Sequence, residues 1–325
     1  MSDWSEVLKP TVFNVDQRKK ILEGREKSYE GKLKLLKIFN RIPDSIWEVR
    51  HTEKVDMAER TQHVISNEHR NDTLKAFDNS TRNQNIRWKG AISIFPRDIL
   101  DKLLDFYTVE GDVFLDPFAG HNSRMSPSYN KYRHYIGYDI SHDFMEFNRE
   151  LAKKLLRDNP KGTSIVLKEQ DSRTIDEPDN SADFIFSSPP YWNLEWYGDE
   201  KEQLGKLSYN DFMRDITIIY QQCYRVLKPG KFCIINVNDF RKGGKYYSYH
   251  VDTVNALKSV GFEQFDHLIM KYPNAMRKSF PNQILEEKLL PKIHEHLLVF
   301  IKPDPSCPGT FPWLKGKKIE DDETL

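Results

Sequence analysis

The chain has 325 residues, and its 49 basic and 49 acidic side chains give a formal net charge of zero. Hydrophobic residues make up 38% of it, with 15 Gly and 17 Pro, which excludes a disordered or collagen-like chain and predicts a globular protein with a sizeable core. The neutral charge argues against binding to a polyanion through bulk charge, so any nucleic-acid contact must be local.

The predicted elements begin with a largely helical N-terminal extension over residues 1–87. Its apolar spacing indicates helices around Gln17 to Phe39, and Arg70 to Arg87 is predicted as a loop. From Trp88 onward, short apolar runs alternate with amphipathic stretches, which predicts one domain over residues 88–303 and a tail over 304–325. The predicted strands are Val113–Leu115, Tyr135–Tyr138, Ile165–Lys168, Asp183–Ser187, Phe232–Val237, Phe265–Lys271 and His296–Ile301. The predicted helices are Asp98–Tyr107, Asp143–Arg157, Tyr209–Leu227 and Val251–Val260.

Strands separated by helices predict an α/β fold with a doubly wound, Rossmann-like sheet of about seven strands. Only a loop separates the last two strands, so these could pair as an antiparallel hairpin. The helix from Tyr209 follows Ser208, a suitable N-cap, and Lys228-Pro229-Gly230 is predicted to stop it. Ligands of such sheets bind at the carboxyl ends of the strands.

Acidic residues follow three successive predicted strands. The first strand is followed by Asp116-Pro117-Phe118-Ala119-Gly120, where Gly120 lets backbone amides approach a ligand closely. Asp139, nineteen positions after Gly120, ends the second strand, where an acid can accept hydrogen bonds from ribose hydroxyls. Asp171, beside Ser172, follows the third strand and could reach an adenine amino group. Together these residues predict a nucleotide-type cofactor site.

The segment Ser187-Ser188-Pro189-Pro190-Tyr191-Trp192 directly follows the apolar strand Asp183–Ser187. Two consecutive prolines hold φ fixed and lack amide donors, so they predict a rigid loop whose carbonyl groups point in set directions. A stiff surface loop would be the interpretation of such a tetrapeptide in isolation. Its position at a strand end, some seventy residues after Gly120, predicts a catalytic loop instead.

Both motifs resemble those of the amino-methyltransferases of DNA. Asp116 to Gly120 is similar to that family's D-P-F-x-G-S-G motif, with His121 and Asn122 in place of Ser and the second Gly. Ile94-Phe95-Pro96 is similar to the segment that precedes this motif and packs on the cofactor's adenine. The resemblance covers about residues 90–302 and implies S-adenosylmethionine as cofactor. A hydrophobic staple and a helix-entering proline is the alternative interpretation of Phe95 and Pro96.

The segment Ser188 to Tyr191 resembles the family's [DNS]-P-P-[YFW] signature. Ser in the first place is typical of cytosine N4 methylation, and Asp or Asn is commoner for adenine N6. An exocyclic amine is a weak nucleophile until acceptors hold its hydrogens, and Ser188 and the Pro189 carbonyl are the expected acceptors. Tyr191 would stack on a base flipped out of double-stranded DNA, and Trp192 would help to wall the pocket. The three cysteines show no paired spacing, which favours a reducing, cytoplasmic setting, and a bacterial or phage-encoded enzyme is expected.

The motif order leaves no room for a recognition domain between the cofactor and catalytic motifs. DNA contacts are therefore predicted in two basic insertions, residues 239–250 with Arg241 and Lys242, and residues 272–292 with Arg277 and Lys278. The N-terminal extension could serve recognition or formation of a homodimer.

Several alternatives stay open at this point. Cytosine C5 chemistry is set aside, because it needs a cysteine after a proline and no cysteine here follows one. His294 and His296 could face one way on a strand, but no metal is expected, and no apolar run predicts a membrane partner. Methylation of adenine N6 in DNA is the first alternative to cytosine N4, and methylation of RNA, methylation of a protein glutamine, or an inactive DNA-binding subunit are the further ones.

Overall fold

The computed structural model describes residues 30–40, 43–49, 95–120, 123–157, 161–194, 200–273 and 281–306. The chain divides into two compact units between Asp44 and Ser45. In the first unit, residues 30–39 are helical, within the range predicted for the N-terminal helices. The second unit contains the sheet and the sites described below.

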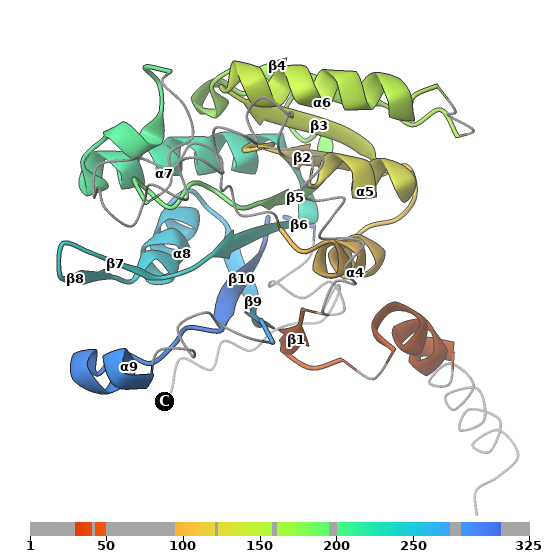
Figure 1. The fold of residues 1–325 in the computed structure, drawn as a ribbon. Coiled ribbons are helices and arrows are strands. Elements are labelled where there is room, and N and C mark those ends of the chain that lie inside the picture. The colour runs from red at the N-terminus through yellow and green to blue at the C-terminus, as the bar shows by residue number, and fades with distance from the viewer. Residues whose placement is uncertain are drawn as a thin grey trace, which may run out of the picture. The chain divides into compact units, whose positions relative to one another are not determined.

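The second unit is built on an eight-stranded sheet with the strand order β1-β9-β10-β6-β5-β2-β3-β4 (Figure 1). All seven predicted strands belong to it. Their bounds are β2 Val113–Asp116, β3 His134–Asp139, β4 Ile165–Glu169, β5 Ala182–Ser187, β6 Leu227–Val237, β9 Glu263–Lys271 and β10 His294–Ile301. β9 and β10 pair antiparallel, which confirms the predicted hairpin, and β6 to β4 run parallel. The fold is therefore the predicted α/β, Rossmann-like sheet.

The eighth strand, β1 (Ile46–Glu48), was not predicted. It pairs parallel with β9, with Ile46 opposite Ile269, and it lies within the stretch predicted as a largely helical extension. Only Trp47 is buried, whereas Ile46 and Glu48 are exposed. The strand therefore contains a single buried apolar residue. Such a strand is too short to show a period of two in the sequence, and its pairing with β9 specifies it instead.

The helices fall into two groups. α4 (Arg97–Tyr107), α5 (Met125–Asn130) and α6 (His142–Leu155) pack together and against β3 and β4. α7 (Tyr209–Val226) and α8 (Tyr249–Ser259) pack against each other and on β6, β9 and β10. Right-handed crossovers explain the two groups (Figure 1), because the chain moves one way along the sheet from β2 to β4 and the other way from β5 to β6.

The point where this direction reverses lies between β2 and β5, which is where ligands of doubly wound sheets bind. β5 is buried along its whole length, as expected for a central strand covered on both faces. Cys223 of α7 and Cys233 of β6 are fully buried. This burial raises the pKa of both thiols, so neither is available as a nucleophile. Among the described helices, none combines the length and apolarity needed to cross a bilayer.

The start of α7 agrees with the sequence prediction, and its end departs from it. The Ser208 hydroxyl caps α7 as predicted, accepting from the Asp211 amide at 3.2 Å. The predicted stop at Lys228-Pro229-Gly230 is replaced by an immediate change of conformation, since α7 ends at Val226 and β6 begins at Leu227. A short helix, α9 (Pro281–Glu287), precedes β10.

Candidate active site

The central hollow lies at the carboxyl ends of β2, β3, β4 and β5. It encloses about 960 Å³ including its open mouth. Six of the predicted cofactor residues and all four predicted catalytic residues line this same hollow, so the two motifs share one cavity. Its lining comprises Pro117, Phe118, Gly120, Ser123, Arg124, Asp139, Ile140, Phe144, Gln170, Asp171, Ser172, Ser188, Pro189, Pro190, Tyr191, Glu202, Gln203, Leu204 and Ile219.

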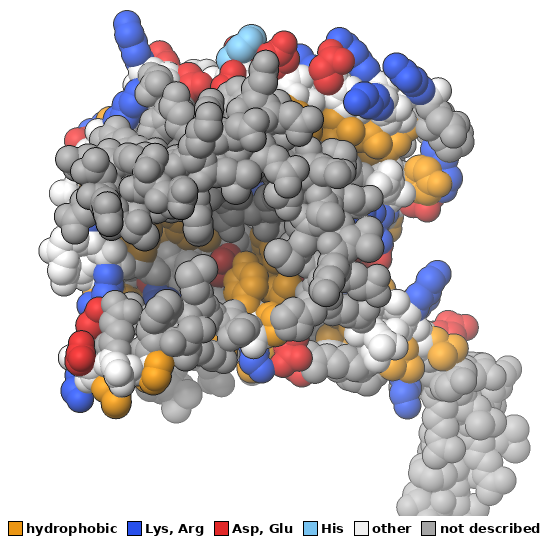
Figure 2. All heavy atoms as spheres, viewed as in Figure 1, with side chains coloured by type: hydrophobic (Ala, Val, Ile, Leu, Met, Phe, Trp, Pro, Cys, Tyr) orange, Lys and Arg blue, Asp and Glu red, His pale blue; other side chains and the backbone are white. Residues whose placement is uncertain are grey.

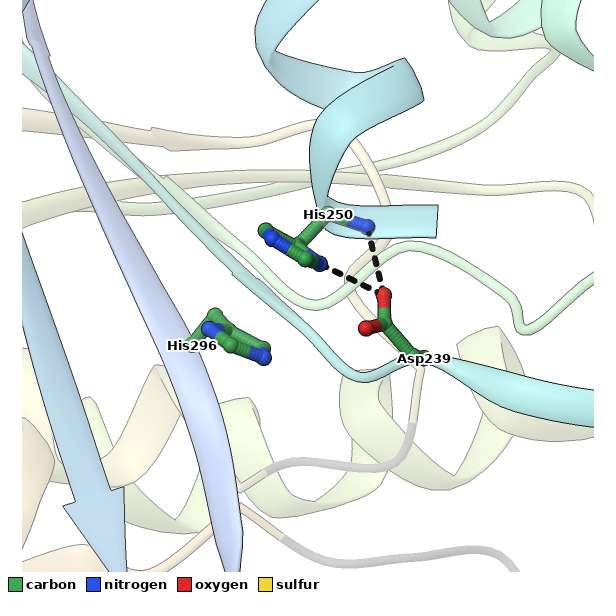
Figure 3. A group of neighbouring side chains, drawn as sticks. All are labelled: Asp239, His250 and His296. Carbon is green, nitrogen blue, oxygen red and sulfur yellow. Dashed lines mark hydrogen bonds and ion pairs between the residues drawn. The ribbon is translucent and has the colours of Figure 1, made fainter. Parts of the chain in front are cut away.

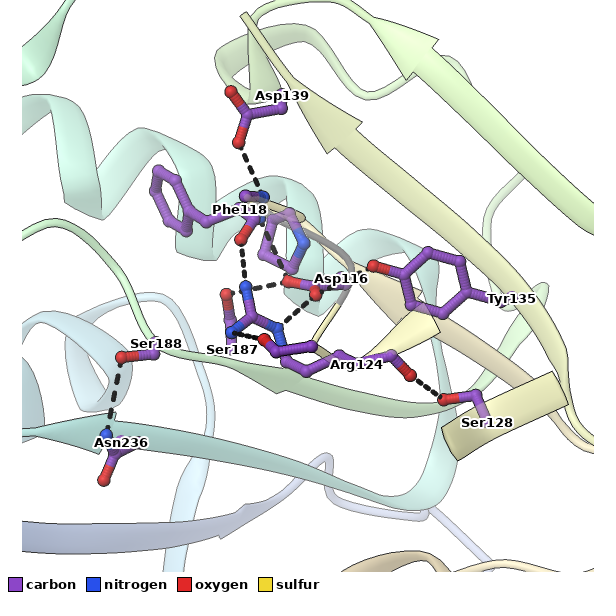
Figure 4. Close-up of polar contacts among 12 residues, drawn as sticks. Asp116, Phe118, Arg124, Ser128, Tyr135, Asp139, Ser187, Ser188 and Asn236 are labelled. Atoms are coloured by element: carbon purple, nitrogen blue, oxygen red, sulfur yellow. Dashed lines mark hydrogen bonds and ion pairs between the residues drawn. The ribbon is translucent and has the colours of Figure 1, made fainter. Parts of the chain in front are cut away.

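Asp116, at the end of β2, is fully buried and organises the turn that follows it (Figure 4). Its Oδ2 accepts from Arg124 Nε at 2.5 Å, and both side chains of this ion pair are less than 7% exposed. The Arg124 guanidinium also donates to the Phe118 carbonyl. Arg124 therefore holds the turn from Asp116 to Gly120 against the carboxyl end of β2. Asp116 itself is not among the residues that line the hollow.

The same carboxylate joins the turn to the catalytic loop. Asp116 Oδ1 accepts from Ser187 Oγ at 3.0 Å, and Oδ2 accepts from the Tyr135 hydroxyl at 3.0 Å (Figure 4). Ser187 is the residue directly before the predicted catalytic motif. The glycine at position 137 makes room for the Tyr135 ring, because a β-carbon there would lie 2.7 Å from that ring. One buried carboxylate thus fixes both motifs relative to each other.

Asp139 ends β3 beside the turn. Its Oδ2 accepts from the Gly120 amide at 2.8 Å and its Oδ1 from the Ser141 amide at 2.9 Å. Asn148 of α6 donates to the Gly120 carbonyl at 2.8 Å, so the glycine, at φ 51°, is held from both sides. Burial raises the pKa of Asp139 to about 6, although the two amide hydrogen bonds act in the opposite direction.

Asp171 and Ser172 follow β4 and line the hollow as well. The Ser172 hydroxyl donates to the Pro117 carbonyl at 2.5 Å, which fixes the β2 turn from its other side. Asp171 caps a short 3-10 turn by accepting from the Arg173 amide at 2.9 Å, and it pairs with the Arg173 guanidinium. Arg173 also reaches Asp215 of α7. Contact of Asp171 with a cofactor amine stays a prediction.

The catalytic loop follows β5. Ser188 Oγ lies 3.4 Å from Asn236 Nδ2, and the Pro190 carbonyl accepts from the Tyr249 hydroxyl at 3.3 Å. The Tyr191 ring packs near Tyr249 with centroids 6.3 Å apart. All four residues from Ser188 to Tyr191 line the hollow, so the loop presents its side chains and its backbone to the cavity that the β2 turn also borders.

Trp192 points elsewhere. Its indole donates to the Leu207 carbonyl at 2.8 Å, and its ring lies 5.3 Å from Tyr247 and 5.4 Å from Tyr209. The residue has φ 51°, a conformation that costs a bulky side chain energy, and its carbonyl would be 3.0 Å from a β-carbon at position 205, which is glycine. Trp192 is not among the lining residues, so its predicted contact with the base stays a prediction.

A two-stranded hairpin, β7 (Phe240–Lys242) and β8 (Lys245–Tyr247), packs on Trp192. It falls within the predicted insertion 239–250. Gly243 and Gly244, both at positive φ, make its two-residue turn. Arg241 lies over the Tyr246 ring at 4.9 Å, Lys242 over Trp192 at 5.1 Å and Lys245 over Tyr247 at 5.0 Å. The hairpin therefore carries three cations, of which Lys242 lies directly over Trp192 at the end of the catalytic loop.

Asp239 anchors this hairpin (Figure 3). Its carboxylate accepts from His250 Nδ1 and from the Tyr246 hydroxyl, both at 2.7 Å, and its carbonyl accepts from Lys292 at 2.7 Å. His250 stacks on His296 with centroids 4.3 Å apart and ring planes 8° apart. Asp239, His250 and His296 offer ligand atoms within 4.8 Å of one another. However, the lone pairs of parallel stacked rings do not converge on one point, so this geometry does not suit a metal ion.

Other predicted site residues lie outside the hollow or outside the described residues. Phe95 is buried against Phe186, with centroids 4.7 Å apart, and Pro96 precedes α4; neither lines the hollow. Their contact with adenine stays a prediction. The positions outside the described residues are His121, Asn122, Arg277 and Lys278.

With this geometry in place, comparison with known proteins shows the family. A model of the DNA methylase family of N6 and N4 methyltransferases matches residues 10–154 and 182–323, and the chain belongs to that family. The Type II methyltransferase M.MjaI of Methanocaldococcus jannaschii is 24% identical over 42% of this chain. The match covers 54% of that protein, so the chain spans about half the length of this curated relative.

Two solved structures overlap with the chain in part. A SAM-dependent methyltransferase of Methanosarcina mazei aligns with a TM-score of 0.43 and 15% identity, over 65% of this chain and 99% of its own. A candidate DNA modification methylase of Thermus thermophilus aligns with a TM-score of 0.31 and 21% identity, over 41% of this chain and 51% of its own. The strand order of this chain defines its α/β, Rossmann-like fold.

S-adenosylmethionine is the methyl donor of this family, and the hollow fits it. Phe118, Ile140, Phe144 and Leu204 offer apolar walls for an adenine ring, and the Asp139 carboxylate borders the same space. Ser188 to Tyr191 line the same hollow, so an acceptor base bound at this loop would adjoin the donor. The predicted cofactor therefore agrees with the residues present.

The raised pKa of Asp139 predicts a pH dependence of cofactor binding. The predicted hydrogen bonds from ribose hydroxyls to the ionised carboxylate would favour its charged form, so the affinity for the cofactor is expected to fall as pH drops through about 6. Titration calorimetry with S-adenosylmethionine should give a Kd about tenfold weaker at pH 5 than at pH 7. Asp139→Asn should bind more weakly and with a nearly flat profile; an equal slope in both proteins would contradict this assignment.

Proposed function

We propose that the chain transfers the methyl group of S-adenosylmethionine to the exocyclic N4 amine of a cytosine flipped out of double-stranded DNA. The observation that carries this proposal is the shared hollow, in which the Asp116 to Gly120 turn and the Ser188 to Tyr191 loop border one cavity. A methyl transfer between two bound molecules requires such proximity, because the reacting atoms must come within about 3.5 Å.

The chain's own groups have distinct tasks in this proposal. The cofactor supplies a methyl group on a positively charged sulfur. Ser188 Oγ and the Pro189 carbonyl accept the amine hydrogens and aim the nitrogen lone pair, while Tyr191 stacks on the base. The Tyr249 bond to the Pro190 carbonyl and the Ser187 bond to Asp116 keep the loop rigid. Base flipping takes the base out of the stack, so the loop itself must orient the amine.

Serine at position 188 favours cytosine N4 over adenine N6, which is the second candidate. A hydroxyl is a smaller acceptor than the carboxylate or amide found at this place in other signatures of the family, and unlike the carboxylate it is neutral. The preference for cytosine therefore depends on Ser188 alone.

The target atom can be identified directly. Duplex DNA of mixed sequence is incubated with the purified chain and methyl-labelled S-adenosylmethionine, digested to nucleosides and analysed by mass spectrometry. We expect label in N4-methyldeoxycytidine. Label in N6-methyldeoxyadenosine would establish the second candidate, and label in RNA or protein but not DNA would refute the proposal. Sequencing of the modified DNA would give the recognition site.

The DNA surface is proposed to include the β7–β8 hairpin, because its cations stand beside the loop that binds the base. Arg241 and Lys245 are exposed, whereas Lys242 also donates to the Asn193 carbonyl at 3.0 Å. By contrast, Figure 2 shows basic and acidic side chains intermixed along α6, which gives no field of one sign there. Arg277 and Lys278, outside the described residues, belong to the same proposal.

Removing the two exposed hairpin charges should weaken DNA binding in a salt-dependent manner. For Arg241→Gln with Lys245→Gln, the slope of log K against log salt should decrease by about two, since each phosphate contact contributes roughly 0.9. Fluorescence anisotropy with labelled duplex across a salt series measures this slope. The matched control is Lys153→Gln with Lys154→Gln on α6, which should leave it unchanged. Equal slopes for all three proteins would remove the hairpin from the DNA surface.

A further inference from the structure

Glu295 of β10 lies beside the catalytic loop, although it is 104 positions from Tyr191. Its Oε2 accepts from Asn236 Nδ2 at 2.7 Å and from the Tyr191 hydroxyl at 3.4 Å. Its Oε1 accepts from the Tyr272 hydroxyl at 3.1 Å. Asn236 Nδ2 also donates to Ser188 Oγ at 3.4 Å. Figure 4 draws this contact as a dashed line between the two side chains. One acidic side chain therefore contacts Tyr191 directly and Ser188 through one amide.

The sheet register brings these residues together. β5, β6 and β10 are neighbours, with Ser187 opposite Ile235 and Val237 opposite His296. Ser188, Asn236 and Glu295 therefore follow one another across the same edge of the sheet. Asn236 is only 2% exposed. A carboxylate can only accept hydrogen bonds, so Glu295 fixes which end of the Asn236 amide faces Ser188.

The charge of this group has a chemical use. As the amine nitrogen bonds the methyl carbon, the bond from that carbon to sulfur breaks, and the nitrogen carries the positive charge until one of its protons leaves to water. A neutral serine at position 188 cannot balance that charge. All three partners of Glu295 named above are donors, as expected around an ionised carboxylate. A fixed negative charge near a developing positive one lowers the barrier.

We propose that Glu295 is a positioning residue of this enzyme, which orients Ser188 through Asn236, orients Tyr191 directly, and places at the site the negative charge that its serine motif lacks. This inference rests on the proposed amine methylation. It assigns to β10 a part of the acceptor site that the loop motif alone does not contain.

The test compares Glu295→Gln with the wild type in binding and in transfer. We expect kcat to fall roughly 10- to 100-fold, with KM for DNA and Kd for S-adenosylmethionine within threefold of wild type. Glu295→Asp, which keeps the charge, should recover part of the loss. Glu263→Gln, an exposed acid at the start of β9, is the matched control and should transfer at the wild-type rate.

Two further measurements separate positioning from folding. Asn236→Leu should lower kcat by a similar factor. The loss of kcat in the double variant with Glu295→Gln should be much smaller than the product of the two single losses, because both residues act on Ser188 through the Asn236 amide. Tyr272→Phe, which removes a hydrogen bond to Glu295 and keeps all charges, should cost less than threefold.

The outcomes are distinguishable from failure of the proposed function. If the wild type methylates no amine of DNA, that function fails. If the wild type methylates DNA and Glu295→Gln does so at the same rate, only the role of Glu295 fails. A loss that Glu295→Asp does not relieve, or that Tyr272→Phe reproduces in full, would also overturn it.

Discussion

Ser188→Ala is expected to lower single-turnover methyl transfer by about 100-fold or more, while leaving the affinity for S-adenosylmethionine nearly unchanged. The hydroxyl is the proposed acceptor for an amine hydrogen, and removal of one such preorganised group typically costs about 10²- to 10³-fold. The cofactor turn is fixed by Asp116 and Ser172 and does not depend on Ser188. Rapid-quench transfer and calorimetry on the same preparation give the two quantities.

The neighbouring serine provides the matched control. Ser187 Oγ donates to the buried Asp116 carboxylate, so Ser187→Ala should reduce stability by about 1–3 kcal/mol and weaken cofactor binding. Transfer from saturated complex should change much less than in Ser188→Ala. If Ser187→Ala and Ser188→Ala lost methyl transfer to the same extent and both kept wild-type cofactor affinity, the separate roles of Ser187 and Ser188 would be disproved.

Arg124→Met should be the most destabilising single substitution near the site. It leaves the Asp116 charge buried without its cation, which typically costs about 3–5 kcal/mol, and it releases the Phe118 carbonyl. Urea unfolding should therefore show a much lower midpoint, and S-adenosylmethionine should bind weakly or not at all to the folded fraction. The measurement is made with and without the cofactor.

Two comparisons test the cause of this loss. Adding Asp116→Asn to Arg124→Met should recover part of the stability, because the uncompensated charge is gone. Lys153→Met removes one partner of an exposed ion pair with Glu150 and should change stability by less than about 1 kcal/mol. A full-sized loss in Lys153→Met, or none in Arg124→Met, would show that burial does not decide the effect.

Much of the fold could be predicted because its signals are local. Each strand of the parallel sheet is a short apolar run, and Asp116, Asp139 and Ser188 follow such runs directly. Parallel strands end at one edge, so these residues had to meet. The β7–β8 hairpin was overlooked although Gly243-Gly244 between aromatic residues is a recognisable signal for a two-residue turn.

The remaining site residues depend on contacts that no local pattern encodes. Arg124 reaches back eight positions to Asp116, and nothing near it distinguishes a buried arginine from an exposed one. Glu295 meets Asn236 only because β10 inserts antiparallel between β9 and β6. A strand order that places β10 elsewhere would separate these residues, so the pairing of the sheet, and not a motif, creates this part of the site.

The carboxylate of Asp116 has a consequence for how enzymes of this design can diversify. Since Ser187 and the Phe118 turn share that single anchor, a change that moves the acceptor loop also disturbs the grip on the donor. Altered sequence preference is therefore easier to acquire at the periphery, in the hairpin and its flanking segments. Natural variants and directed-evolution experiments should accumulate tolerated changes there, while the anchored centre stays constant.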